Sequence, residues 1–456
     1  RSKMLQFVQG GHCYGMAAGI QRFYAGLDAP ENYQAGGNSG HDLQPEPAVR
    51  GLITEMAVSQ FLRPNDGSSS QFIADQGKKP SEYLALIRQR LLTNPTDPYV
   101  LGFSQDGKGG HAVTPYAIEN KGAGIYWLHV YDNNWPDQPR YLTFNLNNES
   151  WAYNFAALNP GVEPDIWQGD ARTDSLMLRP TSAHLASGWA CPFCRHSGVQ
   201  GAGEQTNQVE FQLLGEGQLL VIDAQGRGIG YEFTRQQFIN EIDGAEVQED
   251  YGGLGLEMPP LYRLPQEPSQ TPYIVYVAGQ TDTQPVDADL LMSGPGFAVG
   301  LEFIQINPGE DLLMTIRPDG RQITFNASEE GTFGPDIFLA LDPDPAGDSY
   351  SFDVGGFELE SFKTVTVTLD LDSGLLLFTD DDGAADTYAL NVLRIGADGT
   401  QEYFANDDVE LGGDSNAALN FGAWDGAGAM AVDIDGEEQM LPNEHPNRSH
   451  NRSHNR

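Results

Sequence analysis

The first 95 residues carry apolar positions at helical spacing. Met16, Ile20 and Phe23 recur at intervals of three and four behind a glycine pair. Two further amphipathic runs cover residues 47–62 and 81–92. The pattern therefore predicts a helical segment at the start of the chain.

The period then changes to that of strands. Apolar and β-branched residues predict strands at 99–103, 111–118 and 125–131, the last two joined by the glycine-containing turn 120–124. Helices followed by an antiparallel sheet predict an α+β domain over residues 1–165.

Beyond residue 205 short strands prevail, with one helical run at 234–241. Predicted strands cover residues 218–223, 273–278, 301–306, 312–316, 365–371, 375–378 and 388–395, and Asp-Gly or Gln-Gly turns separate many of them. This pattern is typical of β-sandwich-like modules. We predict a junction with a small β-rich module at 166–270, acidic β-sandwich modules at 271–440 and a disordered tail at 441–456.

Charge separates the two halves further. The chain has 456 residues and a net charge of −39; residues 1–180 hold 18 acidic and 14 basic residues, and the remainder hold 46 and 11. So anionic a surface excludes nucleic acid as a partner, and no apolar run reaches the ~18 residues of a membrane span. Few lysines, many aspartates and long β-rich segments predict an extracellular or cell-surface protein of a bacterium.

Cys13 is the first candidate for chemistry. It follows the glycine pair Gly10-Gly11 and His12 at a predicted helix start, where the helix dipole favours a thiolate and backbone N–H groups can stabilise an oxyanion. The alternative is a buried cysteine that fills the start of the helix.

His111 is the second candidate. It opens a predicted strand, and a hairpin centred near Gly122 pairs residues whose numbers sum to about 244, which places His111 opposite Asp132 or Asn133. A carboxylate or amide there can hold the imidazole in one tautomer. The alternative is an ordinary His–Asp pair on the surface of a hairpin.

These segments resemble papain-like cysteine peptidases. Cys-Tyr-Gly-Met at residue 13, Gly-His-Ala-Val at 110 and Tyr-Asp-Asn-Asn-Trp-Pro at 131 occur in the family's order within residues 1–165. The resemblance implies Cys13 as nucleophile, His111 as general base and acid, Asp132 or Asn133 as orienting residue, a peptide or protein substrate, and no cofactor for catalysis. A carboxylate holds an imidazolium better, which favours Asp132.

The chain departs from this family at the oxyanion hole. The family places a glutamine six residues before the cysteine, but that position is Phe7, and Gln9 lies four residues before Cys13. Either Gln9 serves from a shorter loop or the hole is incomplete.

Cys191 and Cys194 form a second cluster, with His184 and His196 nearby. A glycine-rich stretch follows instead of a helix, which argues against a redox motif. Zn²⁺ is possible by ligand count, but the spacing of Cys194 and His196 disfavours it. A disulfide at the domain junction is favoured.

Aspartate-rich turns follow in the acidic modules. Asp380 and Asp382 are the strongest candidates for Ca²⁺, which binds clustered carboxylate oxygens. The alternative is that these aspartates are solvated turn residues that discourage strand edges from pairing.

Two functions fit these observations. The first is an exported thiol hydrolase, a cysteine peptidase that forms an acyl-enzyme on Cys13. The second is a structural surface or filament subunit with little or no turnover, whose β-modules self-assemble through strand edges.

Overall fold

The computed structural model describes residues 12–444, apart from 61–62, 65–77, 106–107, 158–160, 162, 174, 185–188, 191–207, 216, 249–259, 280–284, 308–310, 327–331, 334, 342–346, 357, 360–362, 382 and 384. The chain forms two compact units, one reaching to residue 191 and the other containing most residues from 204 onward. Within the described residues, none of the helices has the length and apolar character needed to cross a membrane.

The α-helices of the first unit lie where the apolar spacing predicts them. They are α2 (Cys13–Tyr24), α3 (Pro47–Val58) and α5 (Pro80–Thr93), with short 3₁₀ turns η1 (Pro30–Asn32), η2 (Gly40–Asp42) and η3 (Thr181–His184). A proline begins both α3 and α5, where its missing N–H costs no helical hydrogen bond. These three helical predictions are confirmed.

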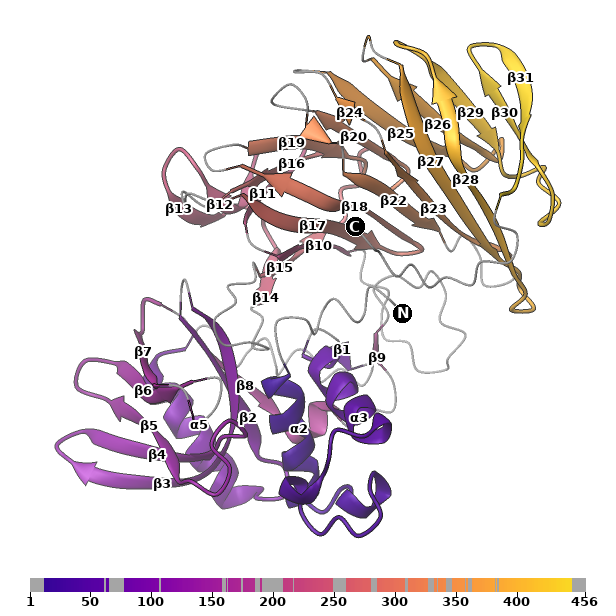
Figure 1. The fold of residues 1–456 in the computed structure, drawn as a ribbon. Coiled ribbons are helices and arrows are strands. Elements are labelled where there is room, and N and C mark those ends of the chain that lie inside the picture. Colours follow the sequence, from indigo (N-terminus) through magenta and orange to yellow (C-terminus); the bar gives the residue numbers. More distant parts are fainter. Residues whose placement is uncertain are drawn as a thin grey trace. The chain divides into compact units, whose positions relative to one another are not determined.

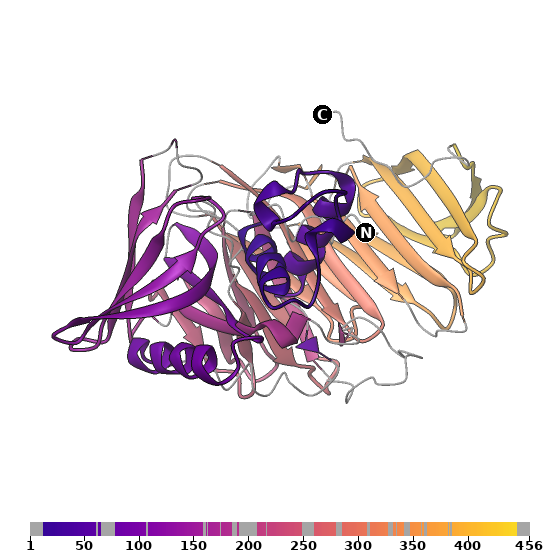
Figure 2. The same ribbon diagram turned by 90° about the horizontal axis from the view of Figure 1, so that it is seen from below.

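A seven-stranded antiparallel sheet forms the rest of the first unit (Figure 1), in the order β7-β6-β5-β4-β3-β2-β8. Its strands are β2 (Tyr99–Gln105), β3 (Gly109–Gly122), β4 (Ile125–Tyr131), β5 (Arg140–Asn145), β6 (Ser150–Ala156), β7 (Asp165–Asp170) and β8 (Leu176–Pro180). A separate pair joins β1 (Arg63–Pro64) to β9 (Trp189–Ala190). Figure 2 shows α5 lying along the sheet, where Tyr83, Leu84 and Ile87 enter its core.

Helix α2 is fixed to the same sheet by a small apolar cluster. Tyr14, Ala17 and Ala18 pack with Val100 and Ala112 of strands β2 and β3. The hydroxyl of Thr114 on β3 also donates a hydrogen bond to the carbonyl of Ala17, at 3.2 Å. The first residue of α2, Cys13, is therefore held at a defined place beside β3.

Gly15 allows α2 and α3 to approach closely. A Cβ atom at Gly15 would lie 2.0 Å from the carbonyl oxygen of Ile53 and 2.9 Å from the amide nitrogen of Ala57. We expect Gly15→Ala to lower the free energy of unfolding by about 1–3 kcal/mol, because the two helices must move apart. Thermal unfolding of the variant measures this.

Gly51 on α3 provides the matched control. It is exposed, and a Cβ there meets nothing within 4 Å. Gly51→Ala should raise stability by about 0.5–1 kcal/mol, since alanine is the better helix former. Equal effects of the two substitutions would contradict the close approach at Gly15.

The second unit consists of two large antiparallel sheets (Figure 1). The nine-stranded sheet has the order β14-β15-β10-β17-β18-β22-β23-β27-β28, with β10 (Gln208–Gly215), β14 (Glu246–Gln248), β15 (Leu261–Pro265), β17 (Val286–Gly294), β18 (Phe297–Ile306), β22 (Asp336–Leu341), β23 (Ser349–Gly355), β27 (Asp386–Ile395) and β28 (Gln401–Leu411).

The eleven-stranded sheet has the order β13-β12-β11-β16-β19-β20-β25-β26-β29-β30-β31. Its strands are β11 (Gln218–Ile222), β12 (Gly228–Glu232), β13 (Gln237–Asn240), β16 (Tyr273–Ala278), β19 (Asp311–Ile316), β20 (Gln322–Asn326), β25 (Thr364–Asp370), β26 (Leu375–Asp380), β29 (Asn416–Asn420), β30 (Met430–Ile434) and β31 (Glu437–Leu441). A small pair joins β21 (Thr332–Phe333) to β24 (Glu358–Leu359).

The chain alternates between these two sheets as it advances. Strands β17 and β18 lie in the first sheet, β19 and β20 in the second, β22 and β23 in the first, and β25 and β26 in the second. Buried side chains from both sheets form one continuous core, in which Phe211 and Tyr273 meet with ring centroids 5.2 Å apart. The strands predicted in this region are present, and they assemble into a single sandwich core.

The helix predicted at 234–241 is wrong. This segment contains β13, whose Phe238 pairs with Tyr231 of β12. Gln236 adopts a left-handed conformation (φ 52°) in the connection, which breaks the helical path.

The predicted fold class is also wrong. It consists of an α+β papain-like N-terminal domain followed by all-β, β-sandwich-like modules. Strands make up 52% of the described residues and helices only 13%, and three large antiparallel sheets dominate. The described residues of the first unit form no clear papain-like α+β domain, because a seven-stranded sheet outweighs the helices there. That sheet includes β7 and β8 and so continues past residue 165, and β10 to β15 share the sheets of the strands beyond residue 271.

Candidate functional site

Cys13, His111 and Asp132 come together in the first unit. Cys13 is the first residue of α2 and is 7% exposed, while His111 on β3 and Asp132 are 0% and 1% exposed. Strands β3 and β4 pair with Thr114 opposite Tyr131, so Asp132, one residue beyond β4, lies beside the start of β3. The hairpin positions the carboxylate, and the packing of α2 on the sheet positions the thiol.

Asp132 is the residue that contacts the imidazole. Nε2 of His111 lies 3.0 Å from Oδ2 of Asp132. The same Oδ2 accepts a hydrogen bond from the hydroxyl of Tyr153, and Oδ1 accepts one from the backbone N–H of Asn134 at 2.8 Å. The carboxylate therefore has donors on both oxygens.

Asn133, the alternative orienting residue, does not take this role. Neither its side-chain oxygen nor its side-chain nitrogen has a hydrogen-bond partner in the described part of the chain. Of the two adjacent candidates, the structure brings Asp132 alone to His111.

The electrostatics of the site favour a charged pair. Burial lowers the pKa of His111, but the Asp132 carboxylate and a hydrogen bond with Cys13 outweigh burial and raise that pKa to about 10. Burial likewise raises the pKa of Asp132, but His111, Tyr153 and the Asn134 amide hold it below its usual value. His111 is therefore protonated and Asp132 ionised at neutral pH.

The second ring nitrogen of His111 is available for proton transfer. Nε2 faces Asp132, whereas Nδ1 is buried and has no nitrogen or oxygen partner among the described residues. Since the Cys13 side chain interacts with the same ring, a proton can pass between the thiol and Nδ1.

Aromatic side chains enclose the imidazole. Phe103 of β2 meets the His111 ring edge-on at a centroid distance of 5.5 Å, and the Tyr153 ring lies 6.3 Å away. Neither residue is among the site residues that the sequence predicts. Phe103 ends the strand predicted at 99–103, whereas Tyr153 lies in none of the predicted strands, and only the sheet order brings both to His111.

The other predicted site residues lie either outside the described residues or in the second unit. Gln9, Cys191, Cys194 and Asp382 lie outside the described residues, so the oxyanion role and the disulfide or zinc at the cysteines stay predictions. Asp380 is buried in the second unit and accepts a hydrogen bond from the Tyr388 hydroxyl. In the described ranges no group of three or more His, Cys, Asp and Glu side chains could hold a metal ion, and Ca²⁺ binding also stays a prediction.

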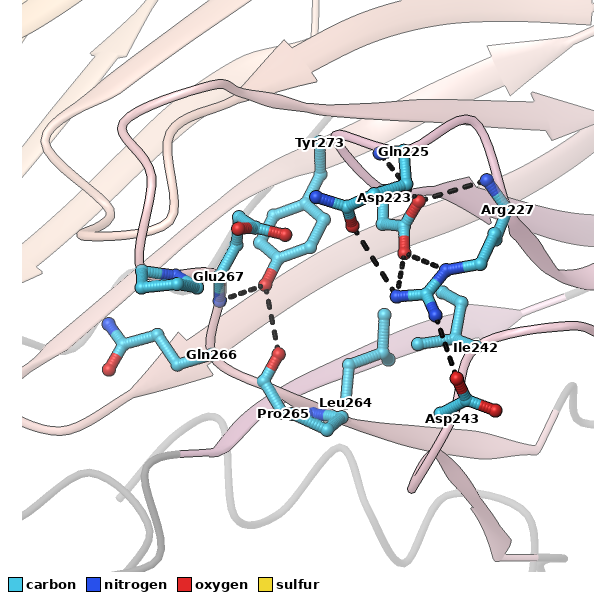
Figure 3. Close-up of a pocket in the computed structure, with 11 residues that line it drawn as sticks. Asp223, Gln225, Arg227, Ile242, Asp243, Leu264, Pro265, Gln266, Glu267 and Tyr273 are labelled. Carbon is cyan, nitrogen blue, oxygen red and sulfur yellow. Dashed lines mark hydrogen bonds and ion pairs between the residues drawn. The ribbon is translucent and has the colours of Figure 1, made fainter.

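A pocket of about 320 Å³ lies in the second unit (Figure 3). Nε of Arg227 donates to Asp223 at 2.8 Å and Nη1 donates to Asp243 at 3.1 Å, while the Tyr273 hydroxyl accepts from the Glu267 amide at 3.0 Å. These polar groups are hydrogen-bonded to one another, and the residues that line the pocket include neither a cysteine nor a histidine. The cluster of Cys13, His111 and Asp132 lies in the first unit.

Comparisons of the chain with protein-family models, with the curated proteins and with solved structures give no match. Cys13, His111 and Asp132 therefore stand on their geometry. The site combines a thiol at a helix start, a buried carboxylate, and an imidazole that interacts with both. These groups meet the chemical requirements of a thiol nucleophile with its base and its orienting group.

Proposed function

We propose that the first unit is a thiol hydrolase, a cysteine peptidase that acts through an acyl-enzyme on Cys13. The alignment of Cys13, His111 and Asp132 is the observation that carries the proposal. It concerns the chemistry of these three side chains and requires no papain-like fold.

The proposed reaction has two balanced steps. In the first, the Cys13 sulfur, whose proton already resides on His111, attacks the substrate carbonyl carbon, and His111 gives that proton to the leaving amine as the C–N bond breaks. In the second, water adds to the thioester and gives one proton to His111, and the C–S bond breaks, which releases the carboxylic acid and leaves the proton on His111. Negative charge on the carbonyl oxygen develops near the N-terminus of α2, which favours it.

Asp132 serves this reaction without exchanging its own proton. It holds the imidazole through Nε2 and stabilises the imidazolium that forms when the thiol ionises. Its burial strengthens this interaction, because little water competes for the charges.

The burial of the site supports a second candidate function. Cys13 is only 7% exposed and His111 is fully buried, which restricts access of a substrate to the sulfur. An extracellular or cell-surface scaffold, or a filament subunit, would retain such a site with little turnover. Its acidic sandwich, with the edge strands β13, β14 and β31, would make the contacts between copies.

Labelling with an epoxysuccinyl thiol probe near pH 7 separates the two functions. We expect covalent modification of Cys13 that is much faster than its reaction with a general alkylating reagent of similar intrinsic reactivity, because His111 can protonate the opening epoxide. Mass mapping of proteolytic peptides locates the label, and the Cys13→Ala variant should lose it.

Cys191 and Cys194 serve as thiol references within the same chain after mild reduction. If the probe labels Cys13 no faster than a free cysteine, the thiol is not activated and the proposal of hydrolysis fails. If labelling of Cys13 is rapid instead, a screen of peptide and amide substrates would define the substrate.

A further inference from the structure

We propose that Tyr153 is a positioning residue of the Cys13 site, which keeps the Asp132 carboxylate oriented toward His111 while a proton moves. This inference rests on the proposed function of Cys13, His111 and Asp132. It adds a fourth residue, from a strand that contributes none of those three.

Tyr153 reaches Asp132 from across the sheet. It lies on β6, which pairs with β5 through Tyr153 and Leu142, and β5 separates β6 from β4, the strand that ends beside Asp132. The Tyr153 side chain is fully buried, and its hydroxyl donates to Oδ2 of Asp132, the oxygen that also faces Nε2 of His111.

A buried carboxylate needs donors that persist. Asp132 has three: the imidazole of His111, the Asn134 amide and the Tyr153 hydroxyl. His111 changes its charge during the proposed reaction, and Asn134 belongs to the turn of Asp132 itself. Tyr153 is the donor that is anchored in a different strand and keeps its proton throughout.

The protonation of Tyr153 is secure. Burial and the adjacent Asp132 charge raise the pKa of Tyr153 far above its usual value. The hydroxyl therefore stays a donor over the whole pH range in which the enzyme would act. With Oδ2 held by Tyr153 and Oδ1 by Asn134, the carboxylate cannot rotate away from His111.

The imidazole N–H proton of His111 tests this arrangement without any substrate. In protein labelled with ¹⁵N-histidine, the strongly hydrogen-bonded Nε2–H should give a downfield NMR signal that His111→Ala removes. We expect Tyr153→Phe to move the acid midpoint for loss of this signal upward by about one to two pH units, because the carboxylate loses a hydrogen bond to its charged form.

Tyr83→Phe is the matched control. Tyr83 is buried in the same hydrophobic core and loses the same hydroxyl, but it is not among the groups that bond Asp132. Its acid midpoint should equal that of the unmodified protein. Identical midpoints for Tyr153→Phe and Tyr83→Phe would overturn the inference.

A double-mutant cycle covers the case in which Tyr153→Phe perturbs packing. If Tyr153 acts through Asp132, Tyr153→Phe should slow Cys13 alkylation in the unmodified background and change it little in an Asp132→Asn background. Additive losses would overturn the inference. A different result is possible, in which Cys13 reacts poorly but Tyr153→Phe still shifts the acid midpoint of the Nε2–H signal. That result would count against the proposed hydrolysis and would still support the role of Tyr153 toward Asp132.

Discussion

Replacing His111 with alanine should slow the alkylation of Cys13 by iodoacetamide at pH 7 by about a hundredfold or more, the contribution of a well-placed general base. The reason is that the His111 imidazole interacts with the Cys13 side chain and, with its pKa raised to about 10, is protonated at pH 7. Without it, the thiol must ionise inside an apolar site. The second-order rate constant, followed by mass spectrometry of the Cys13 peptide, measures this loss.

His129→Ala is the control for this experiment. His129 lies on β4 of the same sheet, but it is partly exposed and faces Glu119, with Nε2 3.2 Å from Oε2. Its removal should leave the alkylation rate unchanged. If His111→Ala and His129→Ala react alike, Cys13 gains nothing from the imidazole and the proposed site is inactive.

Asp132→Ala should lower the free energy of unfolding by about 3–5 kcal/mol at pH 5–6, the cost of removing one partner of a buried ion pair. The carboxylate and His111 are both buried, and Tyr153 loses its acceptor as well. Urea unfolding followed by tryptophan fluorescence measures the change, since Trp127, Trp135, Trp151 and Trp167 belong to the first unit.

The size of this loss should depend on pH. The raised pKa of His111 contributes stability that is complete below its ordinary value of 6.5 and is lost as pH rises toward about 10. The lowered pKa of Asp132 contributes stability that is present above its ordinary value of 3.8 and is lost as pH falls below it. The gap between the unmodified protein and Asp132→Ala should therefore be widest between pH 4 and 6.5 and narrow toward pH 10.

Asp137→Ala controls for the loss of an acidic residue from the same turn region. Its side chain is 83% exposed and lies 3.5 Å from His41, so its removal should have little effect on stability at any pH. A gap for Asp132→Ala that does not vary with pH would contradict the charged state assigned to the pair.

Local patterns in the sequence are sufficient to place much of the candidate site. A glycine pair before helically spaced apolar residues marks the helix that begins at Cys13, and counting outward from the hairpin turn brings His111 near Asp132. Bulges between Pro115 and Ala117 and between Asn120 and Gly122 shift the register slightly, which a simple count cannot include.

Tyr153 and the fold class lay beyond these patterns for a related reason. Tyr153 reaches Asp132 only because β5 and β6 follow β4 in the sheet, and strand order depends on long-range pairing that period-two alternation does not specify. Three clear helical patterns predict an α+β class, whereas the many short strands, each with a weaker pattern, form most of the structure. Residues 234–241 have helical spacing, but strand pairing, which places Phe238 opposite Tyr231, determines their structure.

The alternation of hairpins between the two sheets of the second unit makes that unit a linear array. From β17–β18 onward, the strands of each hairpin pair with the hairpin before it and the hairpin after it in the same sheet. Such an architecture lengthens or shortens by whole hairpins without rerouting the chain, as repeat proteins do. We therefore expect opening of this unit to start at the terminal strand β31 and to spread inward one hairpin at a time.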